Sequence, residues 1–178
     1  GLSKSRNNAL ELATGDICLI CDDDENLHDN YEKLILKAYS EIPDADIITF
    51  RFKYPGKKYD NSIKRIGYLN ASTISSIEIT FKRKKIIESK IRFNESFGAG
   101  SVYALGEENL FLFDCLEKGL KIYYIPVEIG SVKQEKSTWF NGFNQKYFFD
   151  KGAWLDECFP RLKYFLMFYI IFRFRELS

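Results

Sequence analysis

The sequence has few of the residues that bind zinc or cross-link small secreted domains. His28 is the only histidine, and the four cysteines include one C-x-x-C pair, Cys18 and Cys21, without a second pair to complete a zinc site. Four cysteines do not form a disulfide framework in a chain of 178 residues, and an offset of three on a strand turns Cys18 and Cys21 to opposite faces. We therefore interpret the cysteines as small buried apolar residues in a reducing compartment.

Charge of one sign and long hydrophobic runs are missing as well. The net charge is +1, which offers no whole-molecule attraction for nucleic acid. The apolar run 164–172 has nine residues, whereas a membrane-spanning helix needs about 20. Because cationic and aromatic residues flank this run, it is suited either to lie in a membrane interface or to pack on the core or another subunit. With 46% hydrophobic and 29% charged residues, the chain is typical of one globular domain.

The stretch 16–27 is the most informative part of the sequence. Its apolar residues 17–21 suit a buried strand. Four acids follow directly: Asp22, Asp23, Asp24 and Glu25. In an extended chain Asp22 and Asp24 point the same way, and two hard oxygen ligands on one side suit a divalent cation that grips a nucleotide diphosphate. The alternative is a solvated acidic turn that only caps the following helix.

Predicted strands and helices alternate along the chain. Apolar patterning and turn residues predict strands over residues 16–21, 45–52, 78–81 and 121–125. Helical spacing and terminal residues predict helices over residues 3–13, 29–41, 84–89 and 107–118. Residues 53–70 are predicted to form a variable loop or hairpin, and Pro126 is predicted to end the strand before it. This alternation favours an α/β fold, a three-layer sandwich with a mostly parallel sheet.

Several motifs occur in a fixed order around the acidic stretch. Before it stands Gly1-Leu-Ser-Lys-Ser-Arg-Asn, and after it come Phe97-Gly-Ala-Gly, Gly106-Glu-Glu and Lys118-Gly-Leu-Lys-Ile-Tyr-Tyr-Ile-Pro. This order resembles the family 2 glycosyltransferases of the GT-A fold, from Gly1 to Thr138. The resemblance implies a partial GT-A-like domain over residues 1–138 that lacks the N-terminal nucleotide-binding strands. An aromatic, apolar helical extension is expected over residues 139–178.

The resemblance also implies roles for the acids and for two cations. Asp22 and Asp24 match the family's D-x-D and are expected to bind the donor and Mn²⁺ or Mg²⁺, with Asp23 at the variable middle position of the donor site. The metal would neutralise the diphosphate as it leaves. Arg6 and Lys4 are expected to contact the donor diphosphate or to brace the acidic turn.

The acceptor side of the site is expected to contain a general base. A carboxylate can take the proton of the acceptor hydroxyl as the hydroxyl attacks. The G-E-E segment matches the family's G-E-D, which makes Glu108 the expected base and Glu107 its catalytic neighbour. Two acids at a helix start also stabilise the helix dipole without any catalytic role, so that alternative stays open. Phe97, Gly98 and Gly100 are expected to bring backbone close to the acceptor, or to form only a tight turn.

The region after Pro126 departs from the family pattern. Many relatives have a histidine there that completes the metal shell, but residues 131–134 include none. The third metal ligand is therefore expected to be water, or the dependence on metal to be reduced. Lys133 or Lys136 is the alternative contact for the diphosphate.

The resemblance implies an inverting transfer of a sugar from a nucleotide-diphospho-sugar donor to a saccharide or lipid-linked saccharide acceptor. The expected setting is bacterial surface polysaccharide synthesis, in the cytoplasm, with peripheral contact to the inner face of the cytoplasmic membrane. An exposed sheet edge favours a homodimer, and no nucleic-acid partner is expected. A second interpretation is a catalytically inactive remnant that acts as a binding or assembly module.

Overall fold

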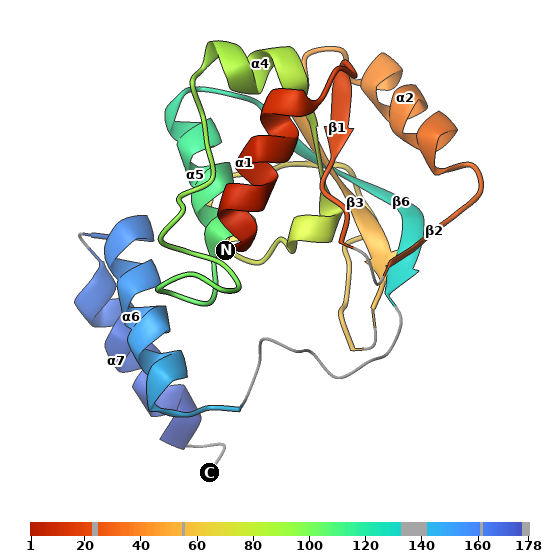
Figure 1. Ribbon diagram of the computed structural model, residues 1–178. Coiled ribbons are helices and arrows are strands. Elements are labelled where there is room, and N and C mark those ends of the chain that lie inside the picture. The colour runs from red at the N-terminus through yellow and green to blue at the C-terminus, as the bar shows by residue number, and fades with distance from the viewer. Residues whose placement is uncertain (23–24, 55, 133–141, 161, 176–178) are drawn as a thin grey trace.

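The computed structural model describes residues 1–22, 25–54, 56–132, 142–160 and 162–175. A central sheet is covered by helices, and two C-terminal helices lie beside one end of the molecule (Figure 1). The helices are α1 (Leu2–Leu12), α2 (Tyr31–Glu41), α3 (Tyr68–Ala71), α4 (Arg83–Glu88), α5 (Glu107–Glu117), α6 (Gln145–Cys158) and α7 (Lys163–Arg175), with a 3₁₀ turn over Ser76–Glu78. The strands are β1 (Ile17–Leu19), β2 (Glu25–Leu27), β3 (Ile47–Lys53), β4 (Lys64–Arg65), β5 (Ile79–Lys82) and β6 (Ile122–Val132).

The sheet is mixed, where a mostly parallel one was expected. Its strand order is β1-β5-β3-β6-β2, and β4 pairs with β6 outside this path. β3 and β6 are parallel, whereas β5 is antiparallel to both β1 and β3, and β2 and β4 are antiparallel to β6. β1, β3 and β6 therefore share one direction. β5 can run the opposite way because the described part of the connection from β3 to β5 contains only the short β4, the one-turn α3 and a 3₁₀ turn, and not the longer helical crossover that parallel neighbours need.

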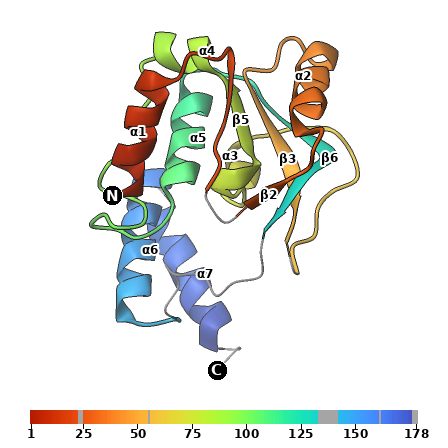
Figure 2. The ribbon, with the colours of Figure 1, turned by 45° about the vertical axis from the view of Figure 1, so that its right-hand side comes forward.

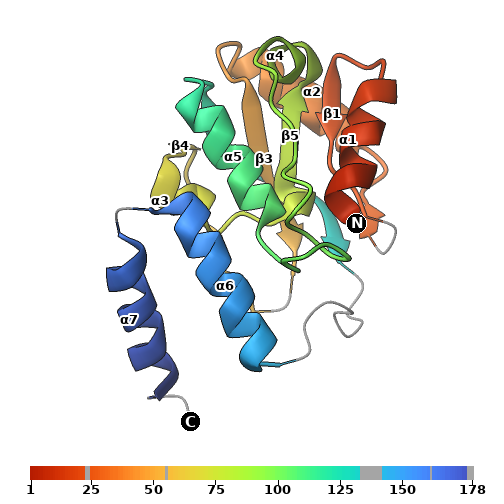
Figure 3. The same ribbon diagram turned by 60° about the vertical axis from the view of Figure 1, so that its left-hand side comes forward.

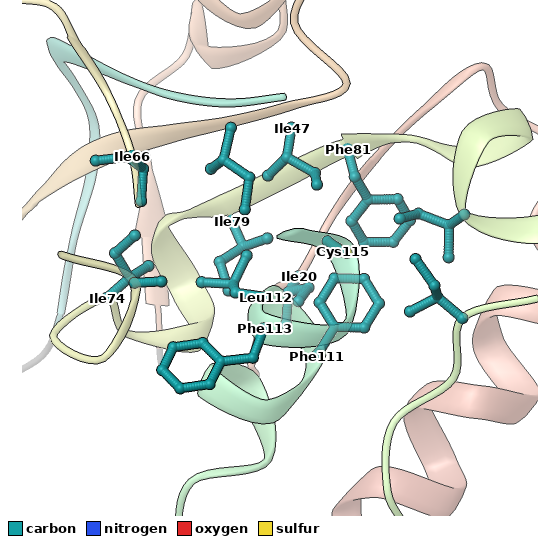
Figure 4. Packing of buried hydrophobic residues seen from close by; sticks show 14 of the residues in the cluster. Ile20, Ile47, Ile66, Ile74, Ile79, Phe81, Phe111, Leu112, Phe113 and Cys115 are labelled. Carbon is teal, nitrogen blue, oxygen red and sulfur yellow. The ribbon is translucent and has the colours of Figure 1, made fainter. Parts of the chain in front are cut away.

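Helices cover both faces of the sheet, which confirms the three-layer α/β arrangement (Figure 2). One core, part of which Figure 4 shows, joins α1, α4 and α5 to the sheet through Leu10, Ile86, Phe111, Leu112, Ile47, Ile79 and Ile122. The opposite core packs α2 on the other face through Ile35, Ala38, Tyr39, Ile48, Phe50 and Ile129. Ile47 and Ile48 enter different cores because successive side chains of a strand point to opposite faces.

β6 continues through Pro126, so the predicted strand end at that residue was wrong. Between Thr49 and Arg51 the pairing shifts: two steps along β3 correspond to the four steps from Tyr124 to Glu128 along β6. An irregularity of this kind leaves some residues of the longer strand outside the regular ladder. Proline is tolerated there because its missing N–H is not needed for a ladder hydrogen bond.

β2 was not predicted, because nothing within its three residues specifies a strand. It pairs with the end of β6, where Leu27 lies opposite Gly130. A Cβ atom added to Gly130 would lie 2.8 Å from the carbonyl oxygen of Asn26. The short strand therefore depends on a long partner strand and on a glycine that lets the two backbones approach closely.

α6 packs beside the loop that leads into α5, and α7 packs against α6 (Figure 3). Trp154 and Leu155 of α6 form a small core with Phe97 and Leu110. α7 exposes a set of large side chains: Tyr164, Phe165, Phe168 and Phe172. Among the described residues, no helix combines the length and the apolar composition that crossing a membrane requires.

Tyr39 provides a test of the core between α2 and the sheet. Its hydroxyl accepts the Ile48 N–H at 3.1 Å and donates to Thr80 Oγ1 at 3.1 Å, because the Thr80 proton is used on the Ile48 carbonyl. Tyr39→Phe leaves buried partners unpaired, so we expect the free energy of unfolding to fall by about 1–3 kcal/mol. Tyr31→Phe removes an exposed hydrogen bond to Glu32 and should change it by less than about 0.5 kcal/mol. Urea denaturation measures both variants, and equal losses would contradict the buried network.

Candidate functional site

The first two turns of α1 hold the distant segment 93–97 in place. Ser3 Oγ donates to the Phe97 carbonyl at 2.6 Å. Asn7 pairs with the backbone of Phe93 at both ends of its amide: Nδ2 donates to the carbonyl and Oδ1 accepts the N–H, each at 2.9 Å. Ser3 and Asn7 are buried, so these contacts satisfy polar groups that would otherwise be costly to bury. The N-terminal motif therefore positions a loop more than 80 residues away in the chain.

The turn that follows Phe97 needs its glycines. Gly98 has φ +102° and Gly100 has φ +74°, a left-handed region that strains other residues. A Cβ atom on Gly98 would lie 3.1 Å from Cδ of Glu107, so the turn backbone passes directly over that carboxylate. The structure thus brings the predicted acceptor residue Gly98 to the predicted catalytic acid Glu107, whereas Gly100 lies against Gly1. The Phe97 side chain is 1% exposed and packs inward, so only its backbone faces this region.

Arg6 joins the acidic stretch after β1 to the start of α5. Its guanidinium donates to Asp22 Oδ1 at 3.0 Å and to Glu107 Oε1 at 2.8 Å. The side chains of Arg6 and Glu107 are 10% and 9% exposed, whereas that of Asp22 is 36% exposed. The Phe93 ring lies 5.7 Å from the guanidinium carbon and limits where it can move. One buried cation therefore compensates two carboxylates, of which Asp22 is the one open to a ligand.

Glu108 lies next to this bridge, at the start of α5, and retains some exposure to solvent. Burial, reinforced by the neighbouring charge of Glu107, raises the pKa of Glu108 to about 8, and the positive charge of Arg6 opposes this shift only in part. A carboxyl group whose pKa lies near neutral pH can accept or release a proton there. Groups with this property gather at functional sites, although structural networks also produce them.

The acids after β1 have the chemistry for a divalent cation. Asp22 offers hard oxygen atoms at an open position, and its N–H is held by Glu25 Oε1 at 3.2 Å. Asp23 and Asp24 lie outside the described residues, so the second metal ligand stays a prediction. Within the described ranges, no group of three or more His, Cys, Asp or Glu side chains is arranged to hold a metal.

Three other predicted contacts fall outside this cluster. Lys4 is exposed on α1 and forms no ion pair among the described residues. Lys133 and Lys136 lie outside the part of the chain that the structure describes. Cys21 is exposed, so its interpretation as a buried residue was wrong; β1 ends at Leu19, and the apolar run leaves the sheet before reaching the acids.

The roles of Ser3 and Asn7 were not predicted from the sequence, although a signal was present. Both residues share the buried stripe of α1 with Leu10. A polar side chain on the apolar stripe of a helix needs a partner, and here each partner is the backbone of the 93–97 segment. Such a pattern indicates a positioning role, but it does not identify the partner in advance.

The fold and the site together define a class of protein. A layered α/β sheet holds acids after its first strand, an arginine links them to acids at a helix start, and a glycine turn covers the link. This is the arrangement expected of a GT-A-type glycosyltransferase domain. A family model described as Glycosyl transferase family 2 matches residues 1–107, and the chain belongs to this family.

Solved structures agree with this assignment. S. aureus TarS 1–349 in complex with UDP-GlcNAc matches with a TM-score of 0.64 and 18% identity over 87% of this chain and 46% of that chain. TarS 1–349 alone matches with a TM-score of 0.62 and 16% identity over 88% and 44%, and a further S. aureus TarS structure with 0.61 and 17% over 88% and 27%. The chain thus spans less than half the length of these proteins. No curated protein matched it. At these identities the likeness confirms the fold class.

Arg6→Met tests the bridge between the two carboxylates. Without the cation, Glu107 is buried beside no opposite charge, so we expect the free energy of unfolding to fall by about 2–4 kcal/mol. Adding Glu107→Gln should recover part of this loss, because a neutral amide costs less to bury. Lys4→Met, on the exposed face of the same helix, is the matched control and should change stability by less than about 0.5 kcal/mol. If urea denaturation gives the same loss for Arg6→Met and Lys4→Met, the bridge adds no net stability.

Proposed function

We propose that this protein transfers a sugar from a nucleotide-diphospho-sugar to a hydroxyl group of a saccharide or lipid-linked saccharide, with inversion at the anomeric carbon. The observation that carries the proposal is Arg6, which joins Asp22 on the expected donor side to Glu107 beside the expected base. Membership of Glycosyl transferase family 2 supports the reaction class. The TarS structure in complex with UDP-GlcNAc supports a nucleotide sugar as the donor class.

The reaction is a single displacement. The acceptor oxygen forms a bond to the anomeric carbon while the bond from that carbon to the diphosphate oxygen breaks, and the nucleoside diphosphate departs with the electron pair. The carboxylate of Glu108 takes the acceptor proton. Attack from the face opposite the leaving group inverts the anomeric configuration. Arg6 and Glu107 hold the two sides of this displacement at a fixed separation.

Asp22 and Asp24 are the residues proposed to hold a divalent metal, Mn²⁺ or Mg²⁺. When bound, the metal supplies positive charge that stabilises the departing diphosphate. Asp22 is suited to this role because it is the more exposed carboxylate on Arg6. Arg6 keeps Asp22 oriented, and its own charge lies close enough to attract an anionic donor.

The raised pKa of Glu108 predicts how activity depends on pH. A base must be unprotonated to work, so the active fraction of the free protein should increase as pH rises through about 8. The same shift supports a second candidate function, a binding or assembly module without catalysis, because a carboxyl group that keeps its proton at neutral pH accepts none. The dependence of kcat/KM on pH separates the two. A rise towards a plateau above pH 8 supports catalysis, and the absence of any turnover supports the binding module.

The cellular setting is proposed from the same family likeness together with α7. We place the reaction on the cytoplasmic side of a bacterial membrane, in surface polysaccharide synthesis. The exposed Phe165, Phe168 and Phe172 would contact the membrane interface, where aromatic side chains are favourable. Sedimentation with anionic vesicles tests this placement, and light scattering tests the alternative of a homodimer.

Glu108→Gln should lower kcat by about a hundredfold or more in the complete protein while donor affinity changes little. The amide keeps the size of the side chain but cannot take the acceptor proton. Steady-state kinetics with donor and acceptor varied separately measure both effects. Glu107→Gln is the comparison: full activity in Glu108→Gln with no activity in Glu107→Gln would exchange the two roles. If both variants are active, Glu107 and Glu108 only form the start of the helix and have no catalytic role.

Asp24→Asn, and more weakly Asp22→Asn, should abolish Mn²⁺-dependent binding of the nucleotide in the complete protein. Each change removes a negative oxygen ligand and keeps the shape of the side chain. Asp23→Asn is the matched control, since the middle position of the motif is expected to be free to vary. Calorimetric titration of nucleoside diphosphates with and without Mn²⁺ gives the result. If the Mn²⁺-dependent affinity for the nucleotide is unchanged in both Asp24→Asn and Asp22→Asn, the assignment of these residues as metal ligands is wrong.

A further inference from the structure

One side of α6 faces the segment 102–106 that leads into α5 (Figure 3). Lys146 Nζ donates to the Val102 carbonyl at 2.9 Å. Asp150 Oδ2 accepts the Ala104 N–H at 3.1 Å, and its other oxygen accepts from Lys146. Asp150 is 1% exposed, so its charge is buried and its partners are specific. α6 therefore provides hydrogen bonds to two alternate residues of this segment.

The third contact of this side is Trp154 on Gly106, the residue before the two acids. A Cβ atom on Gly106 would lie 2.2 Å from Trp154 Cδ1, a distance that no side chain could occupy. Gly106 also has φ +88°, so it is glycine for two separate reasons. Trp154 is 5% exposed, and its Nε1 has no hydrogen-bond partner in the described residues. The indole is thus held by close packing against the turn.

The three contacts follow one side of α6 in order. Lys146, Asp150 and Trp154 are four residues apart, which is about 6 Å per step along a helix axis. Their partners Val102, Ala104 and Gly106 follow in the same chain order, and the last contact lies one residue before the first acid of α5.

Lys151 adds a positive charge on the same helix. Its Nζ lies 3.7 Å from the centre of the Trp154 ring, and it interacts electrostatically with Glu108. The titratable groups that act on Glu108 come from α5, α1 and α6: Glu107, Arg6, Lys151 and Cys158. The charges around the expected base therefore come from the motif residues of α1 and α5 and from α6, a helix outside the residues that the family model matches.

We propose that α6 is a positioning element of the catalytic site: Asp150 and Trp154 hold the segment 102–106 so that Glu108 meets the acceptor hydroxyl. This inference rests on the proposed function for its catalytic meaning. Asp150 and Trp154 touch neither substrate nor reacting atoms; they act through the backbone that begins α5. Their loss changes the orientation of the base and leaves the donor side, on Arg6 and Asp22, in place.

A first test of this positioning role uses hydrogen exchange and NMR titration, and it does not require the protein to be catalytically active. In Asp150→Ala, the Ala104 amide should exchange its hydrogen at least about tenfold faster, while β3 amides keep their protection. The Glu108 carboxyl, followed by carbon NMR, should titrate at least about one pH unit lower, because a loosened helix start admits water. Asp150→Asn keeps an oxygen acceptor for Ala104 and should restore most of both values. Asp156→Asn, an exposed acid of the same helix paired with Lys163, is the control and should change neither.

Kinetics of the complete protein give the second test. Asp150→Ala should lower kcat at least about tenfold with the donor KM unchanged within about twofold, and Asp150→Asn should recover most of kcat. Faster exchange at Ala104 with an unchanged kcat would overturn the proposal, because α6 would then be structural only. An unchanged Glu108 titration would overturn it whether or not the protein is active. If the unmodified protein transfers no sugar while the Glu108 titration still shifts, the proposed function fails and the positioning of Glu108 by α6 stands.

Discussion

The candidate site depends on one buried cation, Arg6, held between two carboxylates. The contact joins α1, the loop after β1 and the start of α5, and its two ends on Glu107 and Arg6 are 101 residues apart in the chain. Because Glu107 is nearly inaccessible to water, loss of Arg6 would leave its buried charge uncompensated. Asp22 is held by the same guanidinium at the solvent boundary. The proposed donor side and the proposed base side are therefore linked by a single side chain.

Close backbone approach is the second constraint, and glycines provide it. Gly98 passes over the Glu107 carboxylate, and Gly106 lies beneath the Trp154 indole, so a Cβ atom at either position would displace a group of the site. Both glycines also have positive φ, where other residues are strained. Polar side chains of α1 and α6 fix the segments on either side of these turns through hydrogen bonds to backbone atoms. The acids of α5 are thus held by packing from two directions.

The predictable parts of the fold were those with strong local signals. α1, α2 and α5 were predicted to within about two residues, because apolar spacing and terminal residues mark them. β2 and the continuation of β6 through Pro126 were not, because pairing with a distant strand decides both. The hydrophobic pattern also did not predict that β5 runs antiparallel to β1 and β3, because the connection between β3 and β5 decides its direction. Within the site, motif residues were identified, whereas Asp150 and Trp154 had no local signature.

By itself, the sequence determined which residue types are available for the chemistry: acids after a short apolar strand, a cation at the sixth position of the first motif, and two acids at a helix start. These are properties of residue type and order, and they persist whatever the fold does. Only the tertiary structure decided which acid shares the cation, which stays open, and which is pushed towards its protonated form. Burial and distance control charge interactions, and both arise when segments remote in sequence pack together.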